Sequence, residues 1–316
     1  MARFTIYFAT DIHGSETCFR KFLNAGAFYG VDAVILGGDV AGKGLIPIVQ
    51  DAGGAWETVL FGRAVRLGSE EELDEFERRM RLQGFYPYRT APDEVEELGK
   101  HGDALDRAFE RAIGRSVEDW IAMADDKLKA AGLPCLVMPG NDDPPLVKRA
   151  MNQATWLVQS EDRVVGLGPY QVLSLGYSTP TPWDSPREIT EEEMRGKLKE
   201  LTARLDPGAP TIFNVHNPPF DTGTDRAYEL TPDLRIKTAG GEPRLVPVGS
   251  VAVREVIEEV QPVLALHGHI HESRAASSVG RTKVCNPGSL YTEGALQGVI
   301  VSLERDKVRA HKFVTG

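Results

Sequence analysis

Six short apolar runs recur along the chain, and most of them end in Gly, Pro, Asp, Asn or His. Runs this short and this uniformly apolar are typical of strands that are buried on both faces of a sheet. We therefore predict strands within FTIYFATDIHG, DAVILGGDV, LPCLVMPGNDD, YQVLSLGYS, PTIFNVHNPP and VLALHGHIHES. The last run of the chain alternates apolar and polar residues around a turn at Arg305 and Asp306, which predicts a closing hairpin.

Charged amphipathic stretches lie between several of these strands and predict helices. Ser69 with Glu72, and Thr190 with Glu193, form the sequence pattern of a capping box at a helix start. Strands that alternate with helices indicate an α/β fold. The interval from about 41 to 132 is mostly charged helical sequence without a Ser- or Gly-rich linker. We interpret it as a helical insertion within one domain that spans residues 1–316.

Composition narrows the classes of protein to consider. The chain has 316 residues, and none of its apolar runs approaches the 18 residues of a membrane span. Its three cysteines are isolated from one another, which favours a reduced, cytoplasmic setting. Acidic residues outnumber basic ones by 46 to 36, and the resulting net charge of −10 disfavours binding to a nucleic-acid backbone.

Side chains that bind metals follow five of the predicted strands. In chain order they are Asp11 and His13, Asp39, Asn141 and Asp142, His216, and His269 and His271. Ligands of open α/β sheets collect at the carboxyl ends of strands, so we expect these side chains to converge. Mixed imidazole and carboxylate ligands suit Zn, Fe, Mn or Co better than Ca or Mg. These residues are more than one ion can bind, which favours two ions bridged by a carboxylate. A bridged pair of ions suits attack of a hydroxide on phosphorus.

Several of these residues also have an ordinary structural explanation. Asp11 and Asp39 could cap the helices that follow their strands, and Asn141 with Asp142 could form a turn. A lone histidine such as His216 is more often structural than a ligand. The ordered series of five strand ends favours metal binding over these alternatives. His267 is interpreted as structural or as a support for the ligands. The NPGS sequence at 286–289 is interpreted as a tight turn, and the flanking cations, Arg187 among them, as surface residues.

The series resembles the calcineurin-like metallophosphoesterases, and within them the Icc-related phosphoesterases. The matching motifs are D-x-H, G-D, G-N, an isolated His and G-H-x-H, in the order of that family. The resemblance implies a four-layer αββα sandwich and two divalent ions, Mn, Fe or Zn, with Mn favoured. It also implies two ligand sets, Asp11, His13, Asp39 and His271 for the first ion, and Asp39, Asn141, His216 and His269 for the second.

One position departs from the family pattern. Members usually read G-N-H-[DE], where the His stabilises the transition state or protonates the leaving oxygen, and this chain has Asp142 instead. Nearby cations lower the pKa of a carboxyl group, so Asp142 should be a poor acid at neutral pH. Losing a positioned acid slows a reaction by about 10²–10⁴-fold, and most for poor leaving groups. Asn141 and Asp142 are the candidate catalytic residues.

The resemblance implies a dinuclear metal-dependent phosphoesterase. Such an enzyme hydrolyses a phosphodiester or a phosphomonoester by in-line attack of a metal-bridging hydroxide, here on a small phosphorylated substrate. The alternative is a phosphoesterase-like binding or scaffold protein with weak or no catalysis. A nuclease is disfavoured by the net charge and by the lack of a basic stripe. No membrane partner is expected, and the oligomeric state is not predicted.

Overall fold

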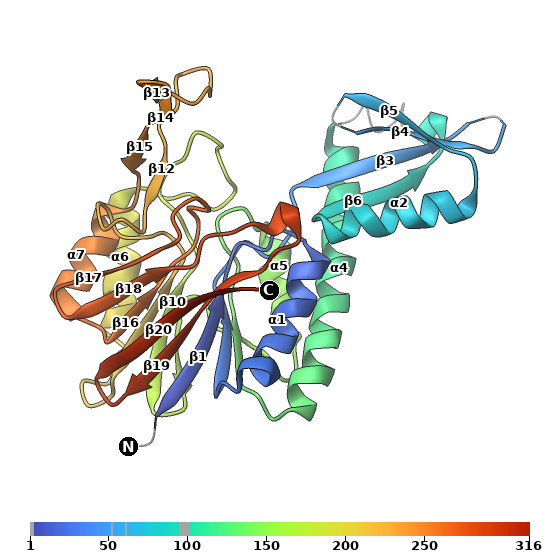
Figure 1. Ribbon diagram of the computed structural model, residues 1–316. Coiled ribbons are helices and arrows are strands. Elements are labelled where there is room, and N and C mark those ends of the chain that lie inside the picture. The colour runs from blue at the N-terminus through green and yellow to red at the C-terminus, as the bar shows by residue number, and fades with distance from the viewer. Residues whose placement is uncertain (1–2, 52, 61, 95–101) are drawn as a thin grey trace.

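A computed structural model describes residues 3–51, 53–60, 62–94 and 102–316, and it has a mixed α/β architecture (Figure 1). Two six-stranded sheets form its main body, and a four-stranded sheet and two small two-stranded sheets lie outside them. The α/β class expected from the sequence is confirmed. No helix among the described residues is both long and apolar enough to cross a membrane.

The first large sheet has the strand order β20-β19-β1-β2-β7-β8. Its strands are β1 (Phe4–Ala9), β2 (Ala33–Leu36), β7 (Cys135–Val137), β8 (Val158–Gln159), β19 (Gln297–Glu304) and β20 (Lys307–Thr315). The four neighbouring strands β1, β2, β7 and β8 are parallel. The predicted closing hairpin is present as the antiparallel pair β19 and β20, and Arg305 in its turn has a positive φ of 55°.

The second large sheet has the strand order β17-β18-β16-β11-β10-β9. Its strands are β9 (Arg163–Leu167), β10 (Tyr170–Leu175), β11 (Thr211–Val215), β16 (Leu264–Leu266), β17 (Ala275–Val279) and β18 (Thr282–Asn286). The inner strands β10, β11, β16 and β18 are parallel to one another, and the two outer strands are antiparallel to their neighbours. All six strands that the apolar runs predict are therefore present in these two sheets.

Each large sheet buries one face against the other sheet and one face under helices. Phe8 and Ile35 of the first sheet share a buried cluster with Ile212 and Leu264 of the second. The opposite face of the first sheet packs against α1 (Glu16–Tyr29), α4 (Gly102–Ala130) and α5 (Pro145–Met151). The opposite face of the second sheet packs against α6 (Glu191–Thr202) and α7 (Val251–Val260). Because both faces are covered, the strands are apolar without alternation.

The insertion contains a sheet that the sequence pattern did not predict. Besides α2 (Glu70–Leu82) and α4 it has β3 (Gly44–Gln50), β4 (Trp56–Leu60), β5 (Arg63–Leu67) and β6 (Phe85–Thr90), in the order β5-β4-β3-β6. Ile48, Leu73 and Met80 belong to a core of its own, and Figure 1 shows this unit standing out from the main body. Its strands carry charged and polar residues on the face that is exposed to solvent, so they lack the uniformly apolar sequence of the strands in the two large sheets. Residues 52, 61 and 95–101 of the predicted insertion lie outside the described residues.

The capping signals read from the sequence mark the helix starts correctly. Thr190 and Glu193 form a complete capping box on α6, and the Ser69 side chain accepts a hydrogen bond from the Glu72 backbone on α2. The remaining short elements are η1 (Tyr291–Glu293), β12 (Arg226–Tyr228), β13 (Thr238–Ala239), β14 (Glu242–Pro243) and β15 (Leu245–Pro247). The pairs β12–β15 and β13–β14 form an arm at the edge of the main body (Figure 1).

Candidate metal centre

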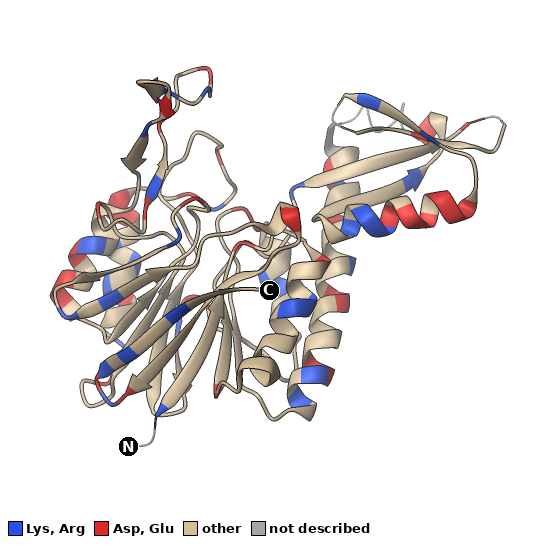
Figure 2. Ribbon diagram, viewed as in Figure 1, with Lys and Arg blue, Asp and Glu red and all other residues tan. Residues whose placement is uncertain are grey.

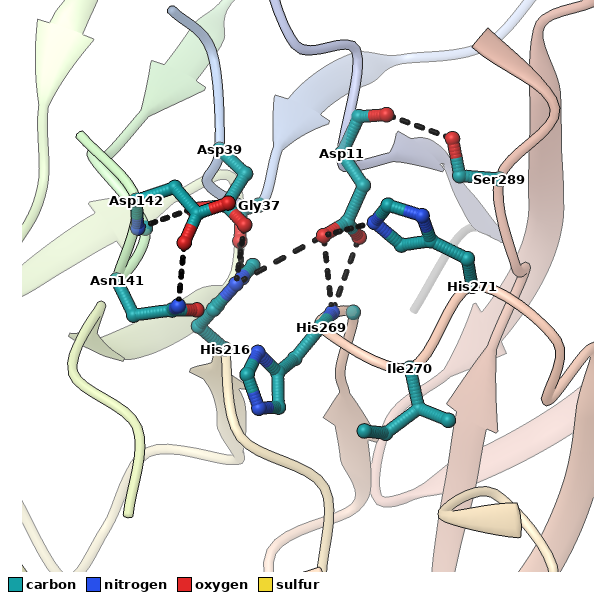
Figure 3. Close-up of polar contacts among 12 residues, drawn as sticks. Asp11, Gly37, Asp39, Asn141, Asp142, His216, His269, Ile270, His271 and Ser289 are labelled. Atoms are coloured by element: carbon teal, nitrogen blue, oxygen red, sulfur yellow. Dashed lines mark hydrogen bonds and ion pairs between the residues drawn. The ribbon is translucent and has the colours of Figure 1, made fainter. Parts of the chain in front are cut away.

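The loops after five parallel strands bring the predicted residues to one place (Figure 3). In the first sheet, β1 leads to Asp11 and His13, β2 leads to Asp39, and β7 leads to Asn141 and Asp142. In the second sheet, β11 leads to His216, and β16 leads to His269 and His271. Within the described part of the chain, three groups have potential ligand atoms within 4.8 Å of one another: Asp11, His13 and His271; Asp39, His216 and His269; and His13, Asp39 and Asp142. Asn141 adjoins them through its hydrogen bond to Asp142.

The backbone at this place adopts a conformation that ordinary residues avoid. Asp11, His13, Asp39 and His269 all have a positive φ, between 39° and 67°. A non-glycine residue in that region costs on the order of 1–3 kcal/mol and persists only where its surroundings hold it. Here the loops after β1 and β2 hold each other, because the backbone amides of Asp11 and His13 donate to the carbonyls of Gly38 and Asp39. Such strain is typical of functional sites.

Asp39 lies between the two halves of the site. Its Oδ2 is 3.3 Å from His216 Nε2 and 3.7 Å from His13 Nε2. On the side of Asp11, His13 Nε2 is 3.0 Å from His271 Nε2, and His271 Nε2 is 3.4 Å from Asp11 Oδ1. The other Asp39 oxygen, Oδ1, accepts a hydrogen bond from the Asp142 backbone amide. One oxygen of Asp39 therefore faces imidazole nitrogens of both halves.

Several buried polar atoms at the site have no hydrogen-bond partner among the described residues. They are His13 Nδ1, Asn141 Oδ1 and His216 Nε2. His216 Nδ1 lies 2.9 Å from the carbonyl oxygen of Gly37, which can only accept, so Nδ1 keeps its proton and Nε2 is the nitrogen that could bind an ion. An unsatisfied buried polar atom costs about 1–3 kcal/mol. A divalent ion would satisfy these lone pairs, and the mixed nitrogen and oxygen donors fit Mn, Fe or Zn.

The charges around the site also favour a cation. Burial alone would lower the pKa of His216, but Asp39 and Asp11 raise it to about 10. Burial, together with the neighbouring His216, lowers the pKa of His269 to about 3, so that its ring is neutral and its nitrogens are available as ligands. Burial likewise holds the pKa of His13 well below its ordinary value. His13 and His269 are thus neutral, the state that a metal ion requires of an imidazole, whereas His216 is protonated beside Asp39 and would release a proton when an ion binds its Nε2.

Asp142 is surrounded by partners that keep it ionised. Burial would raise its pKa, but the Lys43 ammonium, 2.5 Å from Oδ2, and the Ser185 hydroxyl, 2.5 Å from Oδ1, hold it below the ordinary value. The lowered pKa of Asp142 agrees with the expectation from the sequence. The sequence did not indicate its partners Lys43 and Ser185. Asp142 Oδ1 also accepts from Asn141 Nδ2, and Asn141 Oδ1 is left without a hydrogen-bond partner among the described residues.

Lys43 is a charged residue of the site that sequence reasoning missed. Its side chain is about half exposed, and burial alone would lower its pKa, but Asp142 and Asp39 raise it. It therefore carries a positive charge at neutral pH. The sequence signal is its place in the Gly-rich loop GGDVAGKG, four residues after Asp39. Its partner Asp142 is distant in sequence, so only the fold reveals the pair.

Asp143, which sequence reasoning also missed, holds the loops of the site together. It accepts hydrogen bonds from the backbone amides of Val40, Ala41 and Gly140, and so ties the loop after β2 to the loop after β7. Burial and the nearby Asp39 raise the pKa of Asp143 to about 7. Its only sequence signal is that it completes the run of Asn141 and two aspartates.

The NPGS sequence forms a turn, as expected, and also supports the His269 loop. Asn286 Nδ2 donates to the backbone carbonyls of Gly268, Ile270 and Thr224. Ser289 Oγ donates to the Asp11 carbonyl at 2.6 Å. Gly288 has a φ of 69°, which a glycine adopts without strain. His267 Nδ1 lies 2.7 Å from the Val215 carbonyl oxygen, a contact that suits either of the two roles expected for this residue, structural or supporting the ligands.

Arg187 is buried, so its interpretation as a surface cation was wrong. It forms an ion pair with the fully buried Glu161, and it donates to the Gly140 carbonyl beside Asn141. Arg187→Ala should destabilise the protein by about 3 kcal/mol, because it leaves a buried carboxylate with one partner fewer. The matched control is Arg195→Ala, which breaks an exposed pair with Glu255 and should change stability by less than about 1 kcal/mol. Urea unfolding of both variants measures the difference; equal losses would contradict this role.

Comparison with known proteins gives a partial match in sequence. No known protein-family model matches it. Over 155 residues, 48% of this chain, it is 32% identical to "Uncharacterized protein MJ1162" of Methanocaldococcus jannaschii, and the match covers 62% of that protein, less than two thirds of its length.

Solved structures share the overall fold. One crystal structure aligns over 100% of this chain and 99% of its own with a TM-score of 0.56 and 16% identity. The structure of TT1561 from Thermus thermophilus aligns over the same shares with a TM-score of 0.53 and 16% identity. A novel archaeal phosphodiesterase aligns with 62% of this chain and 91% of its own at a TM-score of 0.25 and 13% identity, too low to bear on fold or function. The chain is thus similar in fold to the first two, and its chemistry must be argued from the site.

Proposed function

We propose that this protein is a dinuclear metal-dependent phosphoesterase of the metallophosphoesterase superfamily, with the four-layer αββα arrangement of that superfamily. The observation that carries the proposal is the position of Asp39 Oδ2, which faces imidazole nitrogens of His216 and His13 from the two ligand groups. A carboxylate in that place suits a bridge between two ions. When bound, such a pair of ions neutralises phosphoryl charge and supplies an activated water. We favour Mn²⁺ as the metal and the cytoplasm as the location of the protein.

The protein's own residues would divide the remaining work. His216 is oriented by Gly37 and Asn141 by Asp142, so that each presents one donor atom. Lys43 brings a half-exposed positive charge to the edge of the site, where it can bind a phosphoryl oxygen of a small substrate. Asp142 holds Lys43 in place. Because Asp142 is ionised, it cannot protonate a leaving oxygen. The expected substrates are therefore phosphate esters whose leaving groups depart without a proton.

The ionised Asp142 also keeps the scaffold alternative open. A site without a proton donor could bind metal and a phosphorylated partner without rapid turnover. In that case metal binding would persist and hydrolysis would be weak even for activated esters.

Metal removal and reloading should separate these two functions. We expect metal-stripped protein to lose hydrolysis of a nitrophenyl phosphodiester or its matching monoester, and Mn²⁺ to restore it at about two ions per chain. Elemental analysis of the same samples counts the metal, and comparison of the two esters assigns the reaction class. Two bound ions without turnover would favour the scaffold. Full activity in fully stripped protein would contradict the proposal.

A further inference from the structure

A cavity of about 670 Å³ lies where the insertion joins the main body, away from the ligand atoms of the metal centre. It is bordered by α1, α4 and β6, and its volume is that of a site for a small organic ligand. Its basic lining residues are Arg20, Arg81, Arg111 and Arg115. Figure 2 shows basic segments on α1 and α4, two of the elements that border the cavity, with acidic segments among them on α4.

The lining of this cavity is positive on a chain whose net charge is −10. Four arginines face two carboxylates, those of Glu16 and Asp119. Glu16 already pairs with Arg20 at 2.6 Å, and Arg81 pairs with Glu77, outside the lining, at 2.8 Å. Arg111 lies beside the Tyr88 hydroxyl and near the Glu94 carboxylate. Among the described residues, Arg115 forms no ion pair, so its guanidinium is available to a ligand. Exposed arginines in a cavity offer the planar donors that bind phosphate with two hydrogen bonds.

Aromatic rings form a second part of the lining. Tyr86 and Tyr88 stand two positions apart on β6, so their side chains lie on the same side of the strand. Tyr86 is held by a hydrogen bond from the Gly42 amide, whereas the Tyr88 ring is partly exposed. Trp120 also lines the cavity; it is largely buried and is fixed by stacking on Phe19, with ring centroids 4.4 Å apart. Rigid aromatic faces beside arginines are suited to a flat base that carries a phosphate.

The loop that carries His13 borders this cavity. Gly14 lines the cavity and directly follows His13. A Cβ at Gly14 would lie 2.6 Å from the Gly42 Cα, so the two loops touch without room for a side chain. The Ser15 hydroxyl donates to the Leu82 carbonyl, which fixes the same wall from the side of the insertion. The cavity is therefore a separate compartment that shares a wall with the metal centre.

We propose that this cavity is a second binding site, for a nucleotide, with the phosphate on Arg111 and Arg115 and the base against Tyr88 and Trp120. Nucleotide binding in the cavity requires no catalysis at the metal centre, so this proposal can be tested independently of the phosphoesterase function. The shared wall gives an occupant of the cavity direct contact with the backbone that carries His13.

Binding to the full-length, metal-loaded protein tests the proposal. Calorimetric titration with AMP, ADP and ATP should show saturable binding, while inorganic phosphate and adenosine should each bind more weakly than AMP. Arg111→Gln combined with Arg115→Gln should weaken nucleotide binding at least about tenfold, because charge-assisted hydrogen bonds are lost. Arg163→Gln, on β9 of the second sheet, is the matched control and should leave the affinity unchanged.

Two further readouts locate the bound nucleotide. Asp39→Asn, in the metal centre, should leave nucleotide affinity within about twofold of wild type, whatever its effect on hydrolysis. Nucleotide should change tryptophan fluorescence, and Trp120→Phe should abolish that change. The proposal is overturned if no nucleotide binds saturably, or if phosphate binds as tightly as AMP. It is also overturned if affinity falls in Asp39→Asn and survives loss of both arginines.

Discussion

Asp39→Asn is expected to remove most bound metal from both halves of the site and to abolish hydrolysis. The substitution keeps the size of the side chain and removes the charge that faces His13 and His216. Altering a residue behind the ligands of a metal typically weakens binding or activity by about 10–100-fold, and the effect of a shared ligand should exceed that range. The Asp142 amide also loses a charged acceptor, since it donates to Asp39 Oδ1.

Metal content and initial rates in the same preparations measure this effect. The matched control is Asp125→Asn, which alters a carboxylate that accepts from the backbone amides of Thr155, Trp156 and Leu157, remote from the ligand groups. That control should keep two ions per chain and full activity. If Asp39→Asn loses a single ion and retains part of its activity, Asp39 serves one half of the site alone. Full metal and full activity would mean that Asp39 is no ligand.

The positions of the candidate ligands could be predicted because their signal is local. Each is a polar residue directly after a uniformly apolar run, and parallel strands carry their carboxyl ends to one edge of a sheet. Residues that act through partners distant in sequence gave no such signal. Lys43 meets Asp142, and Arg187 meets Glu161, only because of the strand order of the two sheets.

The same distinction explains the parts of the fold that were missed. Strands covered on both faces, such as β2 and β11, are apolar throughout and stand out from their surroundings. Strands β4 and β5 of the insertion have one open face and include Glu57, Arg63 and Arg66, so they look like the charged helices around them. The arm at 226–247 is built of two- and three-residue strands, which are too short to show an alternation of apolar and polar residues.

Asp142→His is expected to raise hydrolysis of phosphate esters that have poor leaving groups, such as alkyl alcohols. The present carboxylate is ionised beside Lys43 and Ser185, so it has no proton to give. An imidazole at this position would titrate near neutral pH and could protonate the leaving oxygen. A positioned acid contributes about 10²–10⁴-fold, and a nitrophenolate needs no proton to leave. The gain should therefore appear with alkyl esters and be small with nitrophenyl esters.

Rates over a series of diesters with leaving groups of increasing pKa measure this effect, with metal counted for each variant. Asp142→Asn is the matched control, because its amide oxygen can still accept from Asn141 Nδ2 but supplies no acid. Lys43→Met tests phosphate binding by Lys43 separately from the role of Asp142. It removes the positive charge and should slow hydrolysis of all esters alike. An alkyl-specific gain in the His variant alone would place residue 142 at the leaving oxygen. Equal changes for every ester, or none, would put that oxygen beyond its reach and leave Asp142 as the residue that orients Asn141 and Lys43.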